Sequence, residues 1–261
     1  MLLTRIISGV ILAPLFLGVV YLGFPWFDLT IAAAAGIMAA EFTKMDGERG
    51  TKRRLMIAAA CVLAVAAMTH FGFTAAVLVV ILASLCVIAA DIVAGRRGLS
   101  LIHIAVAYIA VPAIAMIYVR TFGDRQSLFW LLAIVWGADT GAYACGRIIG
   151  GPKLAPAISP KKTWSGAVGG LVSGVGASTA VLWAYGATIG PKPLIVALVA
   201  AVATEAGDLL ESGLKRWYEV KDSGTLIPGH GGLLDRFDGL WVAAPVVALF
   251  CWIFGGGVHQ W

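Results

Sequence analysis

Apolar runs of about 20 residues, the length that crosses a hydrocarbon core of about 30 Å, recur from one end of this 261-residue chain to the other. Charged residues make up only 13% of the sequence, against roughly 25% in soluble domains, which need them to keep their surfaces hydrated. One signal peptide would give a single such run near the N-terminus, so it does not explain the pattern. The sequence therefore predicts an all-α integral membrane protein.

Nine apolar runs are separated by charged residues or by glycine and proline. No internal repeat or long linker divides the sequence, so we expect residues 1–261 to form one membrane domain, with its polar motifs in the half from about 130 to 240. The predicted spans are Ile6–Phe24, Trp26–Ala40, Leu55–Thr69, Thr74–Ala94, Leu101–Val119, Ser127–Gly146, Gly166–Tyr185, Pro193–Ser212 and Gly239–Phe254.

The basic residues predict the orientation of these spans, because Lys and Arg accumulate in short cytoplasmic loops. With the N-terminus in the cytoplasm and the C-terminus on the opposite side, 16 of the 19 basic residues face the cytoplasm, and only Arg120, Arg125 and Lys192 lie outside. The net charge of +5 is explained by these loops, so we expect no nucleic-acid partner. The compact chain, without a targeting extension, favours a bacterial inner membrane.

Carboxylates gather at the predicted cytoplasmic ends of three spans. A carboxylate within a span costs roughly 2.5 to 3.5 kcal/mol, so it usually faces a cavity or a partner. On the eighth span, Asp208, Glu211 or Ser212, and Lys215 follow helical spacing and form one polar stripe. Asp235 and Asp238 precede the ninth span three positions apart, and Asp139 lies near the end of the sixth.

Crowded carboxylates repel one another unless a cation neutralises them, and Mg²⁺ is the usual cation for such oxygen ligands. We predict that Asp208, Asp235 and Asp238 bind Mg²⁺, either one ion or two. The alternative is that each acid pairs with a nearby basic residue. That interpretation is kept for Glu205, Asp91 and Glu41, which we take as span-end charges near basic loops; His70, His103 and His259 are interpreted as structural.

Two polar loops are suited to phosphate. The loop before Asp235 contains Lys221, Asp222 and the run His230-Gly231-Gly232, in which glycines let backbone N–H groups approach an anion near a helix N-terminus. A tight turn is the alternative explanation of these glycines. The other loop contains Lys161 and Lys162, which can bind phosphate as point charges or can anchor the seventh span at the cytoplasmic surface.

The run from Ser212-Gly213-Leu214-Lys215-Arg216 through Lys221-Asp222-Ser223-Gly224 and His230-Gly231-Gly232 to Asp235-Arg236-Phe237-Asp238 resembles the signature of phosphatidate cytidylyltransferases, also called CDP-diacylglycerol synthases. Asp139-Thr140-Gly141, the run Ile158–Thr163 and Gly207-Asp208 are also similar, in family order. The motif-bearing resemblance covers about the C-terminal half. One departure is Ser165, where the family usually has Glu or Gln.

The resemblance implies that CTP and phosphatidate react to CDP-diacylglycerol and pyrophosphate, with Mg²⁺ required, at the cytoplasmic face. The partners are then CTP and phosphatidate in the bilayer, with a homodimer left open. The alternatives are a CTP-dependent polyprenol or phytol kinase and a transporter. The predicted catalytic residues are Asp208, Asp235, Asp238, Lys215 and Arg236, and the predicted substrate-binding residues are Lys161, Lys162, Ser212, Arg216, Lys221, Asp222, His230, Gly231 and Gly232.

Overall fold

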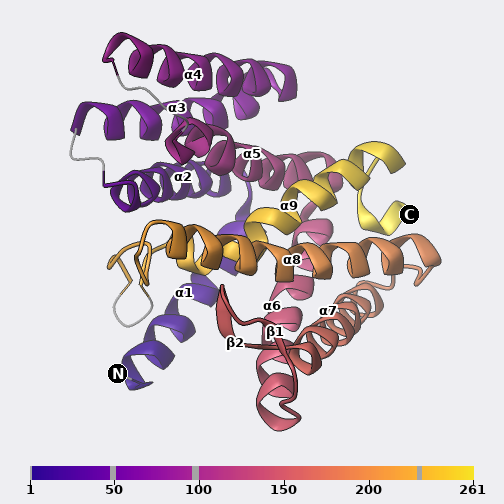
Figure 1. Cartoon of the computed structure of the whole chain (residues 1–261). Helices are drawn as coiled ribbons and strands as arrows, with labels where there is room; N and C mark the ends of the chain where they lie inside the picture. The colour runs from indigo at the N-terminus through magenta and orange to yellow at the C-terminus, as the bar shows by residue number, and fades with distance from the viewer. Residues whose placement is uncertain (1, 48–50, 96–99, 228–230) are drawn as a thin grey trace. The chain divides into compact units, whose positions relative to one another are not determined.

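The structure, a computed structural model, describes residues 2–47, 51–95, 100–227 and 231–261 (Figure 1). Within these ranges the chain forms nine α-helices of 14 residues or more, three shorter helices and one β-hairpin. The helices are α1 (Leu2–Leu22), α2 (Trp26–Met45), α3 (Thr51–Phe71), α4 (Phe73–Val93), α5 (Ala105–Tyr118), α6 (Arg125–Ile148), α7 (Trp164–Ala184), α8 (Pro191–Trp217) and α9 (Leu234–Phe254). The short elements are η1 (Leu101–Ile104), η2 (Val119–Gly123), η3 (Val258–Gln260), β1 (Lys153–Ala155) and β2 (Ser159–Thr163).

Seven helical stretches in the described part of the chain are long and apolar enough to cross a membrane. The protein is therefore an all-α membrane protein, as predicted. Nine spans stay a prediction: α1 contributes the shorter apolar stretch Gly9–Leu22, and α2 carries Asp28, Glu41 and Lys44 among its 20 residues. The candidate spans are Thr51–Phe71, Phe73–Val93, Leu101–Gly123, Arg125–Ile148, Trp164–Ala184, Pro191–Trp217 and Leu234–Gln260.

Both predicted polar loops differ from the expectation in their secondary structure: helices extend into one loop, and the other contains a β-hairpin. Helix α8 continues past the predicted end at Ser212 to Trp217, and α9 begins at Leu234, before the predicted start at Gly239. Apolar runs mark the edge of the lipid, whereas a helix can continue into the polar region beyond it. The other loop contains the β1–β2 hairpin, which the sequence analysis did not predict. Asp235 and Asp238 consequently both lie on helix α9.

The chain divides into two compact units. The N-terminal unit contains Met1–Tyr118 together with the returning segment Val220–Arg236, and the C-terminal unit contains Val119–Glu219 and Phe237–Trp261. The segment Val220–Arg236 carries much of the signature. The helices of the N-terminal half therefore form one unit with a part of the polar motif.

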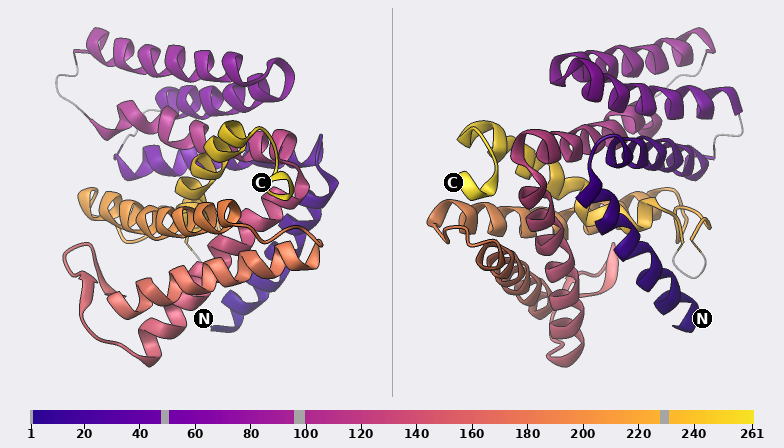
Figure 2. Two further views of the ribbon diagram at one scale, coloured as in Figure 1. Left: turned by 90° about the vertical axis from the view of Figure 1, so that its right-hand side faces the viewer. Right: turned by 180° about the vertical axis from the view of Figure 1, so that it is seen from behind.

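In the N-terminal unit, α3 packs against α2, α4 and α5 (Figure 2). The interior is mostly apolar, and the ring of Phe42 lies 5.5 Å from that of Tyr108. Two polar contacts join the helices: Thr69 Oγ1 donates to Asp28 Oδ1 over 2.8 Å, and buried Asp91 pairs with Arg53 and His103. Asp91 and His103 thus have the structural role that the sequence predicted.

In the C-terminal unit, α6 and α7 form a close helix pair (Figure 2). A Cβ atom added to Gly141 would lie only 2.6 Å from the carbonyl oxygen of Gly169, so the two backbones are in contact. Small residues at helix interfaces allow such approach within membranes. At the C-terminus, Val258 N donates to Ser127 Oγ over 2.8 Å, and His259 Nδ1 lies 2.5 Å from Asp124 Oδ2. His259 is therefore structural, as predicted.

Candidate functional site

Helix α8 presents the polar stripe that its spacing predicted. Ser212 Oγ donates to Asp208 Oδ1 over 3.4 Å, and Lys215 Nζ lies 3.4 Å from Glu211 Oε2. Both pairs are four residues apart, which places their side chains on one face of the helix. Glu211 is fully buried, so its charge depends on Lys215 and on the other polar groups of this face.

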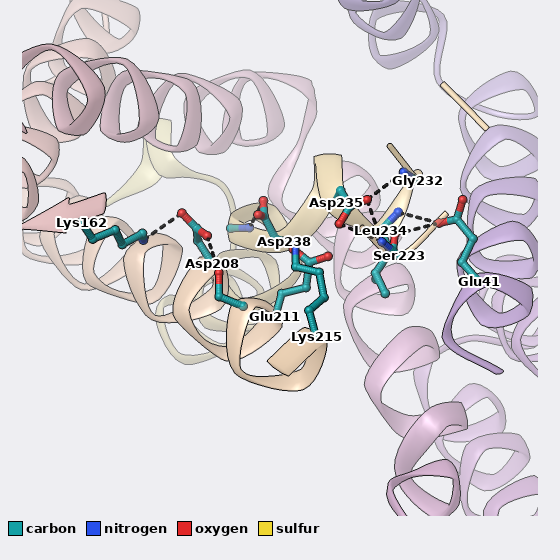
Figure 3. A network of polar contacts seen from close by, with 12 residues as sticks. Glu41, Lys162, Asp208, Glu211, Lys215, Ser223, Gly232, Leu234, Asp235 and Asp238 are labelled. Carbon is teal, nitrogen blue, oxygen red and sulfur yellow. Dashed lines mark hydrogen bonds and ion pairs between the residues drawn. The ribbon is translucent and has the colours of Figure 1, made fainter. Parts of the chain in front are cut away.

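Lys162 of β2 reaches this stripe from the hairpin (Figure 3). Its Nζ lies 2.8 Å from Asp208 Oδ2 and 3.0 Å from Glu205 Oε2. Burial alone would lower the pKa of Lys162, but the carboxylates of Asp208 and Glu205 outweigh it and raise the pKa above its ordinary value. Lys162 therefore remains a cation beside two carboxylates.

Local contacts fix the hairpin on α7. Thr163 Oγ1 caps the helix by accepting from Gly166 N over 3.1 Å. Ser165 Oγ donates to the carbonyl of Gly150 and lies 3.1 Å from Thr163 Oγ1. Lys162 is partly buried, whereas Lys161 is exposed. Ser165, the departure from the family pattern, thus holds the base of the segment that carries Lys162.

Asp238 of α9 joins the group because α8 and α9 come close in the C-terminal unit. A Cβ atom on Gly207 would lie 2.5 Å from the carbonyl oxygen of Asp238. The carboxyl group of Asp238 accepts from Gly239 N over 2.8 Å and lies within electrostatic range of Asp208, Glu211 and Lys215. We name the group of Asp139, Lys162, Glu205, Asp208, Glu211, Lys215 and Asp238 the lysine-carboxylate cluster.

Asp139 of α6 completes this cluster, within electrostatic range of Asp238, Asp208, Glu205 and Lys162. The sequence places Asp139 near the end of a predicted span but predicts no role for it. Five carboxyl groups thus stand with two ammonium groups, an excess of acid that attracts cations. No group of three or more His, Cys, Asp and Glu side chains among residues 2–47, 51–95, 100–227 and 231–261 is arranged to hold a metal ion. The metal site of Asp208, Asp235 and Asp238 stays a prediction.

Asp235 belongs to the N-terminal unit and accepts hydrogen bonds from backbone N–H groups. One of its oxygens accepts from Gly232 N over 2.7 Å and from Ser223 N over 3.0 Å, and the other lies 3.2 Å from Ser223 N (Figure 3). Asp235 is 6% exposed. Its carboxylate therefore links Ser223 and Gly232 to the first turn of α9. We name the part of the chain between Ser223 and Gly232 the glycine-rich turn.

Glu41 of α2 also contacts this turn, through partners that the sequence did not indicate. The expectation is a charge at the end of a span that pairs with a nearby basic residue, but the carboxylate accepts from Leu233 N over 3.0 Å and from Leu234 N over 2.9 Å (Figure 3). Ser223 Oγ lies 3.5 Å away. The only sequence signal was an acid on an apolar helix; its partners lie 192 and 193 positions away. We name Glu41, Ser223, Gly232, Leu233, Leu234 and Asp235 the α9 cap.

Most of the remaining predicted site residues lie at the surface of the described part of the chain. Arg216 is exposed, and its Nε donates to the carbonyl of Ile158 over 3.4 Å. Gly231, with φ of 85°, adopts a backbone conformation that glycine favours. His230 lies outside the described residues. The exposed residues are Lys161, Lys221, Asp222 and Arg236.

Comparison with known proteins covers both units. The sequence model of the cytidylyltransferase family matches residues 3–254. A phosphatidate cytidylyltransferase of Brucella suis is 34% identical over 255 residues, which are 96% of this chain and 93% of that protein. The phosphatidate cytidylyltransferase of Haemophilus influenzae is 44% identical over 128 residues, 47% of this chain and 44% of that protein. That of Staphylococcus saprophyticus is 40% identical over 143 residues, 54% of this chain and 55% of that protein. From its N-terminal helices to the end of α9, this chain belongs to the cytidylyltransferase family.

Proposed function

We propose that the protein transfers the cytidylyl group of CTP to phosphatidate, giving CDP-diacylglycerol and pyrophosphate for phospholipid synthesis. The observation that carries this proposal is the similarity to the Brucella suis phosphatidate cytidylyltransferase, which extends over 96% of the chain and includes both units. Membership of the cytidylyltransferase family makes the protein a nucleotidyltransferase.

The lysine-carboxylate cluster suits this reaction. A phosphate monoester has a second pKa of about 6 and is mostly a dianion at neutral pH, so the lipid phosphate needs no strong general base. The main obstacle is repulsion between two highly charged phosphates. Lys162 and Lys215 can neutralise phosphate oxygens, and each is already held beside carboxylates at 2.8 to 3.4 Å. Ammonium groups held in this way need little rearrangement to bind substrate.

Further residues are proposed from the signature. Asp208, Asp235, Asp238, Lys215 and Arg236 are the proposed catalytic residues. The exposed side chains of Lys161, Arg216, Lys221 and Arg236 can reach soluble CTP or lipid phosphate from the surface. The proposed substrate-binding residues are Lys161, Lys162, Ser212, Arg216, Lys221, Asp222, His230, Gly231 and Gly232.

The excess of carboxylate in the cluster fits a divalent cation. Asp208 and Asp238 are the residues of the C-terminal unit that would hold one Mg²⁺ ion or two, and Asp235 is the third proposed ligand. Carboxylate oxygens are the ligands that Mg²⁺ prefers. When bound, Mg²⁺ would withdraw charge from the phosphate oxygens and the pyrophosphate leaving group. Lys162 and Lys215 would contribute charge of the same sign to the same phosphates.

We further propose nine spans in a bacterial inner membrane, with the N-terminus and the active site in the cytoplasm and the C-terminus outside. The support is the distribution of the 19 basic residues. Single cysteines at Asp222 and at Gln260, in a cysteine-free background, should react with an impermeant reagent from opposite sides of the membrane. Reaction of both from the same side in intact cells would exclude this topology.

The function is tested with purified protein, CTP and Mg²⁺ and a choice of lipid acceptors. Phosphatidate should be converted to CDP-diacylglycerol, while diacylglycerol and polyprenol should give no product. A lipid kinase would require an alcohol, so phosphorylation of polyprenol with phosphatidate left unchanged would contradict the proposal. Ion-dependent uptake into proteoliposomes without consumption of CTP would favour the transporter instead.

A further inference from the structure

Glu41 is a buried carboxylate in the N-terminal helices that contacts the signature segment. It lies near the end of α2, is 5% exposed and accepts hydrogen bonds from Leu233 N and Leu234 N. These N–H groups stand at the start of α9, where the helix leaves its first donors without partners. A carboxylate there is stabilised by two charge-assisted hydrogen bonds and by the helix dipole.

The fit around Glu41 is close on the other side of the turn as well. A Cβ atom on Gly224 would lie 2.6 Å from Glu41 Oε1, and one on Gly232 would lie 2.7 Å from Oε2. Ser223 Oγ is 3.5 Å from Oε2. Gly224 and Gly232 therefore approach the Glu41 carboxylate so closely that neither residue can carry a side chain without displacing the carboxylate.

Glu41 and Asp235 accept hydrogen bonds from different backbone N–H groups of the turn and of the residues that follow it. Asp235 accepts from Ser223 N and Gly232 N, while Glu41 accepts from the two residues that follow Gly232. Across the turn, Ile227 N donates to the carbonyl of Gly231 over 2.9 Å. The exposed pair Lys221 and Asp222 immediately precedes buried Ser223, so its position depends on how this turn is held.

We propose that Glu41 is a positioning residue that holds residues 220–227 and 231–236 of the signature segment in the arrangement that binds the phosphates of CTP. The inference rests on the proposed function. Glu41 acts through the backbone of the turn, and its own oxygens are engaged by Leu233, Leu234 and Ser223. Loss of the carboxylate releases the turn and with it the side chains of Lys221 and Asp222.

The test compares Glu41→Gln with Asp28→Asn in purified full-length protein. Gln keeps the size of the side chain, but its amide N–H₂ group faces backbone N–H donors. Asp28 is a matched control on the same helix, because it accepts from Thr69 Oγ1 within the N-terminal unit. We expect Glu41→Gln to raise KM for CTP about tenfold and to speed tryptic cleavage after exposed Lys221, with Asp28→Asn leaving both within about twofold of the wild type. Partial loss of folded enzyme would lower the apparent kcat and leave KM unchanged.

A second variant removes the contact but keeps the carboxylate. Gly224→Ala places a methyl group against Glu41 and should reproduce both effects, and it carries the test alone where Glu41→Gln does not fold. Gly176→Ala on α7 is its control, because a Cβ there meets nothing within 4 Å. An unchanged KM for CTP in the folded variants overturns the proposal, with or without faster cleavage. A raised KM with unchanged cleavage also overturns it, since Glu41 would then act on the substrate. A wild-type enzyme without cytidylyl transfer contradicts the proposed function, while the cleavage comparison still reports on the turn.

Discussion

The two units use their carboxylates differently. In the α9 cap of the N-terminal unit, Glu41 and Asp235 accept hydrogen bonds from backbone N–H groups at 2.7 to 3.2 Å. In the lysine-carboxylate cluster of the C-terminal unit, Asp208 and Glu205 face the side chain of Lys162, and Glu211 faces Lys215. The first arrangement fixes a turn of the chain, whereas the second places charged side chains opposite one another.

This difference suits the α9 cap and the lysine-carboxylate cluster to different roles. A backbone N–H group cannot leave its carboxylate without unfolding the turn, so the α9 cap is suited to positioning. A lysine can exchange a carboxylate for a phosphate through a rotation of its own side chain. A carboxylate released in this exchange can bind a cation. The cluster therefore offers ammonium groups to phosphate and carboxylates to a cation. The α9 cap holds the signature segment in place.

The largest expected effect is that of Asp208→Asn. The change removes one charge from the cluster with almost no change of shape, so turnover should fall at least about a thousandfold while the protein remains inserted. Tryptic cleavage after Lys221 should stay as in the wild type, because Asp208 contacts Lys162 and Ser212 of its own unit. Glu219→Gln, which changes an exposed acid two residues after the end of α8, serves as the control. Substantial activity of purified Asp208→Asn at saturating Mg²⁺ would remove Asp208 from the metal site.

Asp235→Asn should also abolish turnover, but with a second effect that Asp208→Asn lacks. An amide cannot accept from Ser223 N and Gly232 N in the way that the carboxylate does, so cleavage after Lys221 should become faster. The pair of variants thus distinguishes the two units by proteolysis rather than by activity. Equal cleavage rates in Asp235→Asn and Asp208→Asn would break the comparison between cap and cluster, and retained activity would remove Asp235 from the proposed ligands.

Lys162→Gln should have a smaller effect, a fall in kcat/KM of about a hundredfold. The loss removes a cation that lies 2.8 Å from Asp208 and leaves two carboxylates to repel each other. Neighbouring Lys161 is exposed, so Lys161→Gln should cost less than Lys162→Gln. A larger loss in Lys161→Gln would show that the partly buried lysine is the less important one.

The pKa of Lys162 gives this pair a pH dependence. Because Asp208 and Glu205 raise it, the stabilisation from protonated Lys162 is fully present below the ordinary lysine pKa of about 10.4 and is lost only above it. The difference in thermal stability between wild type and Lys162→Gln should therefore be constant from pH 7 to 9. A difference that disappears within this interval would contradict the ion pairs of Lys162.

The positions of the helices could be predicted from the sequence because a span must be apolar along its whole length. The stripe of Asp208, Ser212 and Lys215 could be predicted for a similar reason, since neighbours on one helix follow from spacing alone. The helix ends could not, because Leu214–Trp217 and Leu234–Asp238 are polar enough to be taken for loop. Whether residues 1–261 form a single membrane domain stays a prediction.

Contacts over long sequence separations were the other limit. Glu41 binds backbone N–H groups, and any residue except proline offers such a donor, so nothing in the sequence of Leu233 or Leu234 marks them as partners. The pairing of Lys162 with Asp208 was missed for the same reason: both were placed in the site, but the predicted partner of Asp208 was Mg²⁺, with basic residues nearby in the sequence as the alternative. Ser165 illustrates a third case, because its bond to the Gly150 carbonyl depends on a hairpin that no pattern indicated.

The central claim, transfer of a cytidylyl group to a lipid phosphate, is tested most directly by following the phosphorus atoms of CTP. Purified enzyme is given phosphatidate, Mg²⁺ and CTP labelled at either the α or the γ phosphorus, and the lipid is then extracted. We expect label from the α position to enter the lipid and label from the γ position to leave in pyrophosphate. Lipid labelled only from the γ position would contradict cytidylyl transfer and identify a CTP-dependent kinase.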